Sequence, residues 1–453
     1  MKTKPDQPSP DNPSSTDSRL AVIGLGYVGL PLATAAARVG MQVMGIDVDE
    51  RKIASINAGH SYIPDVSDEE LAEVQANGSF GATADYAVLA EADAIFICVP
   101  TPFDEMRAPD LQYVVAACEG IVYYLKSGHL IVLQSTTYPG TTEEVVQPIL
   151  EKSGLKAGRD FNLAFSPERI DPGQTSSPGW DVSNTPKVVG GLTPQCTRRA
   201  ANLLLSLGAP VHPVSTARAA EMSKLLENIY RSVNIALVNE LALLAERMKI
   251  DFWEVIEAAK TKPFGFMPFY PGPGVGGHCI PVDPYYLSWK ARAYDFYTKF
   301  IELAAEVNQA MPYHIVDLVG KALGQRARPL FGAHVIVLGV AFKPDIDDAR
   351  NSPAERIIEL LMDRGATVTY HDPFVPAFTV GGDVWRSEPL TLTSIPLSDT
   401  VLKNCDCVVV VTGHHKIDYP WVVTNAPLVV DSCNATGRFG QQPAHVIRMG
   451  APS

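Results

Sequence analysis

The sequence predicts an α/β protein with two Rossmann-like, doubly wound domains joined by a long central helix. Three observations lead to this prediction. A strand, a glycine-rich turn, a helix and a second strand follow one another from Leu20 to Asp47. The same succession, without the glycine-rich turn, returns from His334 to Asp372. Between the two copies, apolar residues recur at helical spacing through residues 214–250.

The first copy has the pattern of a dinucleotide-binding βαβ unit. Its turn reads Gly24-Leu25-Gly26-Tyr27-Val28-Gly29. Gly24 would make the tight turn, Gly26 would let the backbone approach a pyrophosphate, and Gly29 would let helix and strand pack closely. Asp47 ends the second strand, where it would bind the ribose hydroxyls and disfavour a 2′-phosphate. The unit therefore predicts NAD as the cofactor, with Tyr27 and Val28 in the cofactor loop.

Small hydroxyl residues follow two further predicted strands. Ala94–Val99 leads to Thr101, and Leu130–Leu133 leads to Thr136. Because the carboxyl ends of strands line the ligand crevice of an open parallel sheet, both threonines are candidate neighbours of the cofactor. For Thr101, an ordinary loop or helix-cap role explains the pattern equally well. Glu168 follows another short strand and fits either a structural salt bridge or an active-site acid, and the pattern does not choose between them.

Residues 214–250 are predicted to form one long helix, which would serve as a spine between domains and often provides a dimer surface. Lys224 and Asn228 are four residues apart and share a face with Glu221. Taken on spacing alone, this face is better interpreted as solvated. Its polar side chains would then form helix-stabilising pairs, each contributing only ~0.2–0.5 kcal/mol. A functional face is the alternative.

The stretch Pro271–Leu287 reads PGPGVGGHCIPVDPYYL. Neither a helix nor a strand interior tolerates this density of glycine and proline, so we expect a tight, irregular loop. Cys279 stands in this loop, and Asp283 follows it by four residues. A thiol on such a loop, with a carboxylate nearby, is a candidate nucleophile with a candidate base. The alternative is a surface turn with an inert cysteine.

The second copy carries charged residues where the first has its glycines. Its first loop, residues 340–351, contains Lys343, Asp345, Asp347, Asp348 and Arg350. Ser352 to Glu355 predict a capping box at the start of the following helix, with Pro353 at the first helical position. Lys343 and Arg350 stand beside this helix start, which suits phosphate groups. The alternative is a set of internal ion pairs among the five charges.

Composition narrows the classes of function. The chain has 453 residues and a net charge of −13, which argues against nucleic acid as a partner. Its seven cysteines include no CxxC pair, so we expect neither a metal site nor a disulfide framework. No signal peptide and no apolar run of about 18 residues is present, which predicts a cytoplasmic protein without membrane contact.

Together these motifs resemble the nucleotide-sugar 6-dehydrogenase family, which comprises the UDP-glucose and GDP-mannose dehydrogenases. The resemblance extends over about residues 19–435. The motifs that carry it are GLGYVGLPLA at 24–33, VPTP at 99–102, SPER at 166–169, the Lys224/Asn228 helix, GVGGHCIPVDP at 274–284 and FKPDIDDARNSP at 342–353. The cysteine loop is most similar to the branch that oxidises UDP-N-acetylhexosamines, with UDP-N-acetylglucosamine as the expected substrate and UDP-glucose, UDP-GalNAc or UDP-ManNAc as alternatives.

The resemblance implies a domain plan for the chain. A disordered tail over residues 1–18 would precede an NAD-binding domain over 19–213. A central helical and dimerisation region with the cysteine loop would span 214–325. A C-terminal domain that binds the UDP-sugar would span 326–453. The expected assembly is a homodimer or a higher homo-oligomer.

The resemblance also implies a four-electron oxidation of the C6 alcohol to a carboxylate with two NAD⁺, for surface polysaccharide precursors. Cys279 would form a thiohemiacetal and then a thioester. Lys224 and Asn228 would stabilise the charged oxygen, which reverses the solvated interpretation of their face. The other implied site residues are Asp283 and Glu168 for water and proton handling, Thr136 at cofactor and site, Gly276 and Lys343 at the substrate, and Arg350 at the substrate or cofactor.

The sequence departs from the family pattern at one place and leaves two rival functions open. Several UDP-glucose relatives place an arginine shortly before the glycine-rich loop, where it reaches a neighbouring subunit's substrate, but residues 261–270 contain no arginine. The sequence therefore departs from this pattern of substrate contact across subunits. A two-electron hydroxyacid dehydrogenase would need Lys224 and Asn228 but not Cys279. A non-catalytic regulator that binds NAD or a nucleotide sugar would need no thiol.

Overall fold

The computed structural model describes residues 18–104, 108–170, 180–277, 280–382, 386–439 and 443–452. The chain forms two compact units. The first comprises the chain up to Glu227 together with Tyr285–Asp295, and the second comprises Asn228–Pro284 and Phe296–Ser453. The helix α7 (Ala217–Met248) contributes to both units. The predicted tail lies outside the described residues except for Ser18, and the boundaries predicted after residues 213 and 325 stay predictions.

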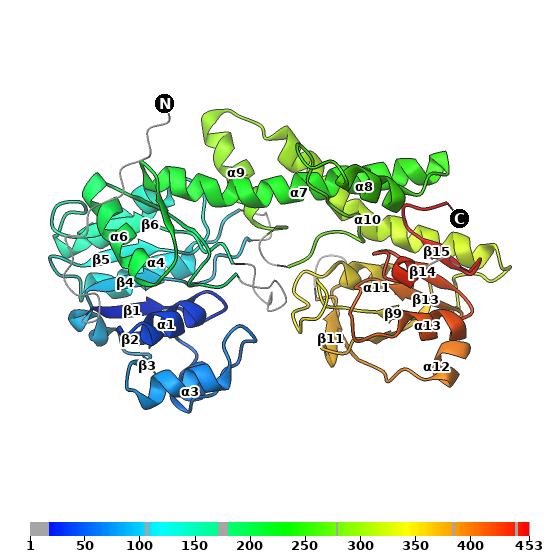
Figure 1. The fold of residues 1–453 in the computed structure, drawn as a ribbon, viewed down its shortest axis with the longest axis horizontal. Helices are drawn as coiled ribbons and strands as arrows, with labels where there is room; N and C mark the ends of the chain where they lie inside the picture. Colours follow the sequence, from blue (N-terminus) through cyan, green and yellow to red (C-terminus); the bar gives the residue numbers. More distant parts are fainter. Residues whose placement is uncertain are drawn as a thin grey trace. The chain divides into compact units, whose positions relative to one another are not determined.

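An eight-stranded sheet forms the centre of the first unit (Figure 1). Its spatial order is β3 (Phe80–Thr83), β2 (Gln42–Ile46), β1 (Arg19–Ile23), β4 (Ala94–Ile97), β5 (Leu130–Leu133), β6 (Asn162–Phe165), β7 (Lys187–Gly191) and β8 (Val211–Pro213). Neighbouring strands are parallel except β6 and β7. The strand order reverses between β1 and β4, and ligands of open α/β sheets bind at the carboxyl ends of strands at such a point.

Helices cover both faces of this sheet, because alternate strand residues point to opposite sides and both sides are apolar. Leu20 and Val22 pack against one set of helices, and Ala21 and Ile23 against another. The first set is α1 (Gly29–Arg38), α2 (Glu50–Asn57), α3 (Asp68–Ala76) and α6 (Pro194–Ser206). The second set is η2 (Tyr86–Glu91), α4 (Gln112–Val122), η3 (Thr142–Val146), α5 (Gln147–Leu150) and the start of α7.

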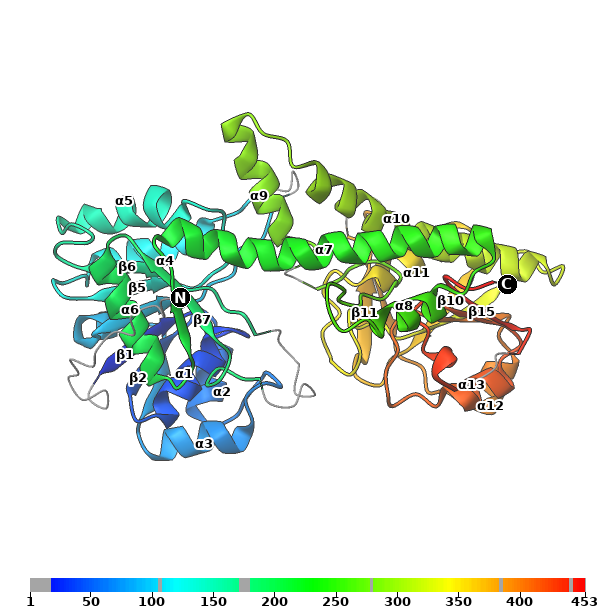
Figure 2. The ribbon, with the colours of Figure 1, turned by 45° about the horizontal axis from the view of Figure 1, so that its top comes forward.

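A five-stranded parallel sheet forms the centre of the second unit. Its spatial order is β10 (Thr367–His371), β9 (His334–Leu338), β13 (Cys407–Val410), β14 (Val429–Asp431) and β15 (Val446–Arg448). Helices α10 (Lys299–Gly324) and α11 (Pro353–Asp363) cover one face, and α12 (Asp399–Lys403) and α13 (Tyr419–Asn425) cover the other (Figure 2). Both sheets are doubly wound, so the predicted fold class is confirmed.

The remaining elements are short. They are α8 (Phe252–Lys260), α9 (Asp283–Ala291), the hairpin of β11 (Ala377–Val380) and β12 (Leu390–Thr393), and the helical turns η4 (Glu151–Ser153), η5 (Arg292–Tyr294) and η6 (Thr436–Phe439). Among the helices of the described residues, none has both the length and the apolar character needed to cross a bilayer.

The two sheets begin with the same turn. Gly24 after β1 and Gly339 after β9 have φ of +91° and +81°, a region that favours glycine. A Cβ at Gly24 would lie 2.7 Å from the Cys98 carbonyl oxygen, and one at Gly339 would lie 2.5 Å from that of Thr412. The turn that follows the first strand of each sheet therefore requires glycine at this position.

An aspartate at the end of the second strand holds each of these turns. Asp47 accepts a hydrogen bond from the Leu25 N–H at 2.9 Å. Asp372 accepts bonds from the Val340 and Ala341 N–H groups at 2.7 and 3.0 Å. The internal repeat predicted from spacing is thus also seen in the hydrogen bonds, because in both units an aspartate after the second strand binds the turn after the first.

The predicted capping box at α11 is wrong in its bonding. The Ser352 hydroxyl does cap the helix, but it accepts from the Ala354 N–H at 3.2 Å. The Glu355 N–H donates to the Ser352 carbonyl at 3.1 Å instead. The serine cap was therefore foreseen correctly, whereas the reciprocal pair of bonds was not.

Asp372 gives the stability of the second unit a predictable acid dependence. Burial alone raises the pKa of this carboxyl, but hydrogen bonds from His414, Phe374 and Val340 lower it to about 2. Since a free aspartate has a pKa near 3.9, the group stabilises the fold above pH 4 and loses this effect as the pH falls toward 2.

We expect the difference in unfolding free energy between the wild type and Asp372→Asn to shrink by about 1 kcal/mol between pH 6 and pH 3. Urea denaturation at both pH values measures it. A difference that stays constant, or grows on acidification, would contradict the assignment.

Candidate functional site

The candidate site residues are distributed over both units. The first unit holds Gly24, Gly26, Tyr27, Val28, Gly29, Asp47, Thr101, Thr136, Glu168 and Lys224. The second holds Asn228, Gly276, Asp283, Lys343 and Arg350. Cys279 lies outside the described residues, as does His278.

The glycine turn after β1 has the shape that the sequence predicts. A Cβ on Gly29 would lie 1.8 Å from the Gly24 carbonyl oxygen, so helix α1 can approach the turn only with glycine at this position. By contrast, no described atom lies within 4 Å of a Cβ built on Gly26. The backbone at Gly26 therefore has room for a group to approach closely. The first turn of α1, which has no side-chain cap, offers N–H groups to an anion.

Asp47 is buried at the end of β2. One carboxylate oxygen accepts from the Leu25 N–H at 2.9 Å, and the other accepts from the Asp49 N–H at 2.9 Å. The Lys52 ammonium lies 3.4 Å from the first oxygen. Asp47 therefore supports the glycine turn directly, in addition to the ribose contact predicted for it.

Thr101 and Thr136 lie against each other at the carboxyl ends of β4 and β5. The Thr101 hydroxyl donates to the Thr136 carbonyl oxygen at 2.8 Å. The buried Tyr286 hydroxyl of α9 donates to the Thr101 carbonyl oxygen. The two candidate threonines are thus brought together, and α9 is tied to the same point.

Glu168 is buried in an ion pair with Lys187, the first residue of β7. The Lys187 ammonium lies 2.9 and 2.8 Å from the two carboxylate oxygens, and the lysine is 1% exposed. Gln134 and the N–H groups of Arg169 and Ile170 also donate to this carboxylate. Burial raises the pKa of Glu168, but Lys187 and these hydrogen bonds outweigh burial and lower it. Of the two roles that the sequence left open, this geometry favours the structural salt bridge.

The polar face of α7 is not solvated. Glu221, Lys224 and Asn228 are all buried, so the interpretation from spacing alone is wrong. Glu221 accepts from the Gly140 N–H at 2.5 Å and from the N–H and hydroxyl of Thr142 at 2.9 and 2.7 Å. A helix face that receives backbone donors from a neighbouring loop is held in place, and Lys224 follows Glu221 by one turn of this helix.

Asn228 contacts the aspartate that follows the cysteine in the sequence. The Asn228 amide nitrogen donates to an Asp283 carboxylate oxygen at 2.5 Å, and both side chains are buried. Asp283 is the first residue of α9, where a carboxylate is favoured by the helix dipole. The structure therefore brings together two candidate residues that are 55 positions apart.

The glycine-rich loop is fixed at its start by α7. The Asn239 side-chain oxygen accepts from the Gly272 N–H at 2.9 Å, and the Asn239 amide donates to Asn308 of α10 at 3.0 Å. A Cβ on Gly276 would lie 2.7 Å from the Phe342 Cβ, so the loop packs closely on the loop after β9.

Ion pairs do occur in the loop after β9. Arg350 and Asp348 form a bidentate pair with distances of 2.9 and 2.5 Å. Asp345 pairs with His415, and the Lys343 ammonium lies 5.6 Å from the centre of the Phe342 ring. The Arg350–Asp348 pair agrees with the ion-pair interpretation of this loop, and the phosphate-binding interpretation stays a prediction.

The sequence matches three consecutive domains of one family. Residues 18–207 match the NAD binding domain of the UDP-glucose/GDP-mannose dehydrogenase family, residues 218–310 its central domain and residues 336–438 its UDP binding domain. The chain belongs to the UDP-glucose/GDP-mannose dehydrogenase family.

Similar members of the family act on N-acetylated sugars, by their names. The chain is 39% identical to UDP-N-acetyl-D-glucosamine 6-dehydrogenase of Pseudomonas aeruginosa over 363 residues, which are 80% of this chain and 84% of that one. It is 37% identical to UDP-N-acetyl-D-mannosamine dehydrogenase of Escherichia coli K12 over 358 residues, 76% and 82% of the two chains. The solved UDP-D-ManNAc dehydrogenase of Pyrococcus horikoshii superimposes with a TM-score of 0.84 at 31% identity, covering 95% of this chain and 99% of the other.

As a member of the UDP-glucose/GDP-mannose dehydrogenase family, this chain is an NAD-dependent oxidoreductase that acts on a UDP-sugar. The residues present fit NAD. The open backbone at Gly26 leaves room for a pyrophosphate, and the uncapped start of α1 supplies N–H donors to it. When bound, NAD⁺ supplies the hydride acceptor. The predicted cofactor and enzyme class are thus confirmed.

Sequence reasoning missed four residues that contact candidate site residues or the loops that carry them: Lys187, Gln134, Asn239 and His414. Lys187 gave a faint signal, because a charged residue opens the otherwise apolar run Lys187–Gly191. Gln134 directly follows the apolar run Leu130–Leu133, as Thr136 does two residues later, whereas Asn239 gave no signal because its partners are distant in the sequence. His414 follows an apolar run that ends at Val411, as candidate residues do elsewhere in this chain.

Replacing Asp47 with alanine is expected to raise the KM for NAD⁺ about 10- to 100-fold, because a hydrogen bond to a charged group contributes about 1.5–3 kcal/mol. It should also reduce the preference for NAD⁺ over NADP⁺. Steady-state kinetics with both cofactors measures this. Asp49→Ala, which removes the cap of α2 two residues away, is the control and should leave the preference unchanged. An unaltered preference in Asp47→Ala would refute the assignment.

Proposed function

We propose that this dehydrogenase oxidises the C6 hydroxyl of a UDP-N-acetylhexosamine to the carboxylate, with UDP-N-acetylglucosamine as the first candidate. The observation that carries the proposal is the 39% identity to the Pseudomonas aeruginosa enzyme over 80% of this chain. UDP-N-acetylmannosamine is the second candidate, because the Escherichia coli and Pyrococcus horikoshii proteins bear that sugar in their names. The product would serve as a precursor of surface polysaccharide.

Two oxidations convert an alcohol into a carboxylate, and each requires different catalytic groups. The alcohol would lose a hydride to bound NAD⁺ and a proton to a base, which yields an aldehyde. The aldehyde becomes a hydride donor only after a nucleophile adds to its carbon. We assign this addition to the Cys279 thiolate, which forms a thiohemiacetal. The thiohemiacetal would then lose a hydride to a second NAD⁺ and its hydroxyl proton to a base, which yields a thioester. Hydrolysis of the thioester by water would release the carboxylate, a proton and the thiol.

The described residues support this scheme by their chemistry. Lys224 and Asn228 are buried, so a cation and an amide donor are held at reduced contact with water, where they stabilise a charged oxygen more strongly. Asp283 is bound by Asn228, which would orient the carboxylate as it positions or deprotonates the hydrolytic water. We assign Thr136 to the cofactor side, and Gly276, Lys343 and Arg350 to the substrate.

We also propose that the chain forms a homodimer or a higher homo-oligomer. Helix α7 carries exposed apolar side chains, namely Met222, Leu226, Leu237, Leu241, Leu244 and Met248. Contact with a second copy would remove these side chains from water, which favours association. Light scattering of the purified protein measures the assembly.

The stoichiometry of NADH tests the reaction. Limiting UDP-N-acetylglucosamine should yield two NADH per sugar, and UDP-ManNAc, UDP-GalNAc and UDP-glucose run beside it should yield less or react more slowly. A faster reaction with one of the other three sugars would reassign the substrate. One NADH per sugar would mean that the reaction stops at the aldehyde, as in a two-electron dehydrogenase. No NADH from any sugar, with binding intact, would favour the non-catalytic regulator.

A further inference from the structure

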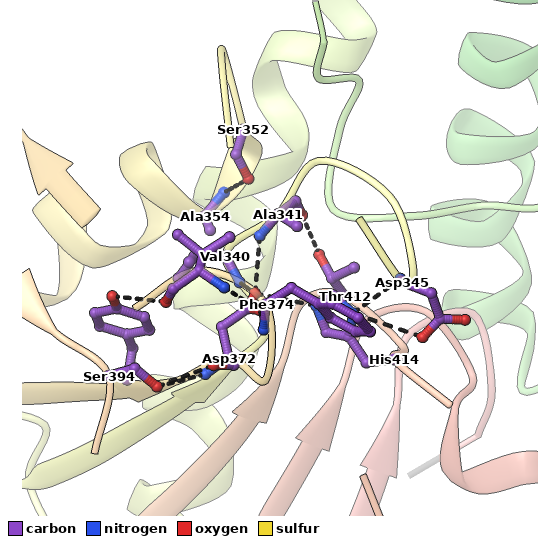
Figure 3. Close-up of polar contacts among 12 residues, drawn as sticks. Val340, Ala341, Asp345, Ser352, Ala354, Asp372, Phe374, Ser394, Thr412 and His414 are labelled. Atoms are coloured by element: carbon purple, nitrogen blue, oxygen red, sulfur yellow. Dashed lines mark hydrogen bonds and ion pairs between the residues drawn. The ribbon is translucent and has the colours of Figure 1, made fainter. Parts of the chain in front are cut away.

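A buried histidine occupies the switch point of the second sheet. The strand order of this sheet reverses between β9 and β13, and His414 follows β13 by four residues. Its side chain is inaccessible to solvent and lies beside the ring of Phe374, with the ring centres 5.2 Å apart (Figure 3). Ligands of open α/β sheets bind at such a point, so His414 lies beside the ligand crevice that is expected for this sheet.

His414 joins the end of β10 to the loop after β9. The Asp345 N–H donates to His414 Nδ1 at 3.0 Å, and His414 Nε2 lies 3.0 Å from an Asp372 carboxylate oxygen. A backbone N–H can only donate, so Nδ1 is the acceptor. Nε2 therefore carries the hydrogen and donates it to Asp372. The imidazole thus uses both nitrogens, one toward the loop and one toward the strand (Figure 3).

The loop that His414 holds, residues 340–352, contains two left-handed backbone positions. Asp345 and Asn351 have φ of +62° and +51°, in a region that aspartate and asparagine adopt more readily than other non-glycine residues. Contacts with the surrounding structure hold the loop in this conformation. The contacts come from the segment after β13, where Thr412 donates to the Ala341 carbonyl at 2.6 Å and the His415 N–H donates to the Asp345 carboxylate at 2.9 Å.

The loop of residues 340–352 in turn supports the glycine-rich loop that begins at Pro271. The Gly277 N–H donates to the Arg350 carbonyl at 3.0 Å, and the Asn351 amide donates to the Gly277 carbonyl at 3.0 Å. Gly277 has φ of +87°, and a Cβ there would lie 2.9 Å from the Phe342 ring. Both backbone groups of Gly277 are therefore bound to the loop, and Cys279 follows two positions later in the sequence.

We propose that His414 is a positioning residue for the oxidation. By bridging Asp372 and Asp345 it sets the conformation of residues 340–352, and through Arg350 and Asn351 that loop sets the position of Gly277, which precedes the nucleophile by two residues in the sequence. The inference rests on the proposed function, in which Cys279 is the nucleophile.

Two substitutions separate the halves of the bridge. In His414→Gln the amide nitrogen can replace Nε2 toward Asp372, but the acceptor for Asp345 is lost. In His414→Asn the side-chain oxygen can replace Nδ1 toward Asp345, but the donor to Asp372 is lost. His445→Gln is the matched control, because His445 belongs to the same unit and bonds the Val423 carbonyl at 2.8 Å. All proteins are full-length, and their thermal midpoints are measured first.

The main readout is the rate at which iodoacetamide alkylates Cys279, quantified on its peptide by mass spectrometry. We expect both His414 variants to change this rate at least about fivefold. We also expect kcat to fall at least about tenfold, because small misplacements of reacting groups lower turnover strongly. The KM for NAD⁺ should stay within about twofold of the wild type, and so should every parameter of His445→Gln.

If the His414 variants do not fold, Asn351→Gly tests the next link, since glycine accepts the left-handed φ while the donor to Gly277 is lost. The same change in alkylation is expected. An alkylation rate and a kcat within twofold of the wild type, in the folded variants tested, would overturn the proposal. A wild type that forms no NADH would instead overturn the proposed function, and the alkylation rates would still decide whether His414 positions this loop.

Discussion

Replacing Cys279 with serine is expected to abolish carboxylate formation. We expect kcat for this product to fall by at least about 10³-fold, equivalent to about 4 kcal/mol of transition-state stabilisation, because the second oxidation requires the thiolate. At most one NADH should form per UDP-sugar, in contrast to two with the wild type. Single-turnover measurement of NADH, with analysis of the sugar product, gives both numbers.

Cys433→Ala is the control for this experiment. Cys433 is a half-buried cysteine at the end of β14, outside the proposed mechanism, and its replacement should leave the yield at two NADH. If Cys279→Ser kept both the wild-type turnover and the yield of two NADH, the covalent route would be disproved. The two-electron rival would be supported if wild type and variant both produced a single NADH at equal rates.

Replacing Lys187 with methionine is expected to destabilise the first unit by about 3–5 kcal/mol, because it leaves the buried Glu168 carboxylate without its cation. Within the described part of the chain, the other donors to this carboxylate are Gln134 and two backbone N–H groups, which bring no full charge. Calorimetric unfolding without ligands measures the change. Lys152→Met, at an exposed lysine of the same unit, is the control and should change stability by no more than about 0.5 kcal/mol.

The double variant Glu168→Gln/Lys187→Met distinguishes a buried ion pair from simple loss of packing. Removing both charges should restore much of the stability lost in Lys187→Met, because no uncompensated charge remains. Additive destabilisation by the two substitutions would show that the charges are not coupled. Glu168 would then need another explanation, and its assignment to proton handling would regain weight.

The sequence predicted the parts of the molecule that depend on local spacing. Periodicity predicted the two strand–helix–strand units and the long helix α7. Residues that accept unusual backbone angles predicted the glycine turn. Gly24 illustrates this, since its φ of +91° lies in the left-handed region that favours glycine. Such requirements act within a few residues of the chain and therefore leave a readable pattern.

The burial of the polar face of α7 could not be predicted from spacing. Spacing places Glu221, Lys224 and Asn228 on one face, but spacing does not tell what covers that face. Glu221 is buried because the loop that contains Gly140 and Thr142, about 80 residues earlier, donates three hydrogen bonds to it. The family resemblance, not the pattern, suggested that this face is functional.

The sequence by itself determined the fold class, the cofactor and the order of the candidate residues, because glycine turns, strand ends and helical periods are local properties. The tertiary structure alone decided which polar groups meet. It paired Glu168 with Lys187, Asn228 with Asp283, and His414 with Asp372, across separations of 19, 55 and 42 residues. Buried charges and amides need partners, and the packing of distant strands and loops chooses those partners.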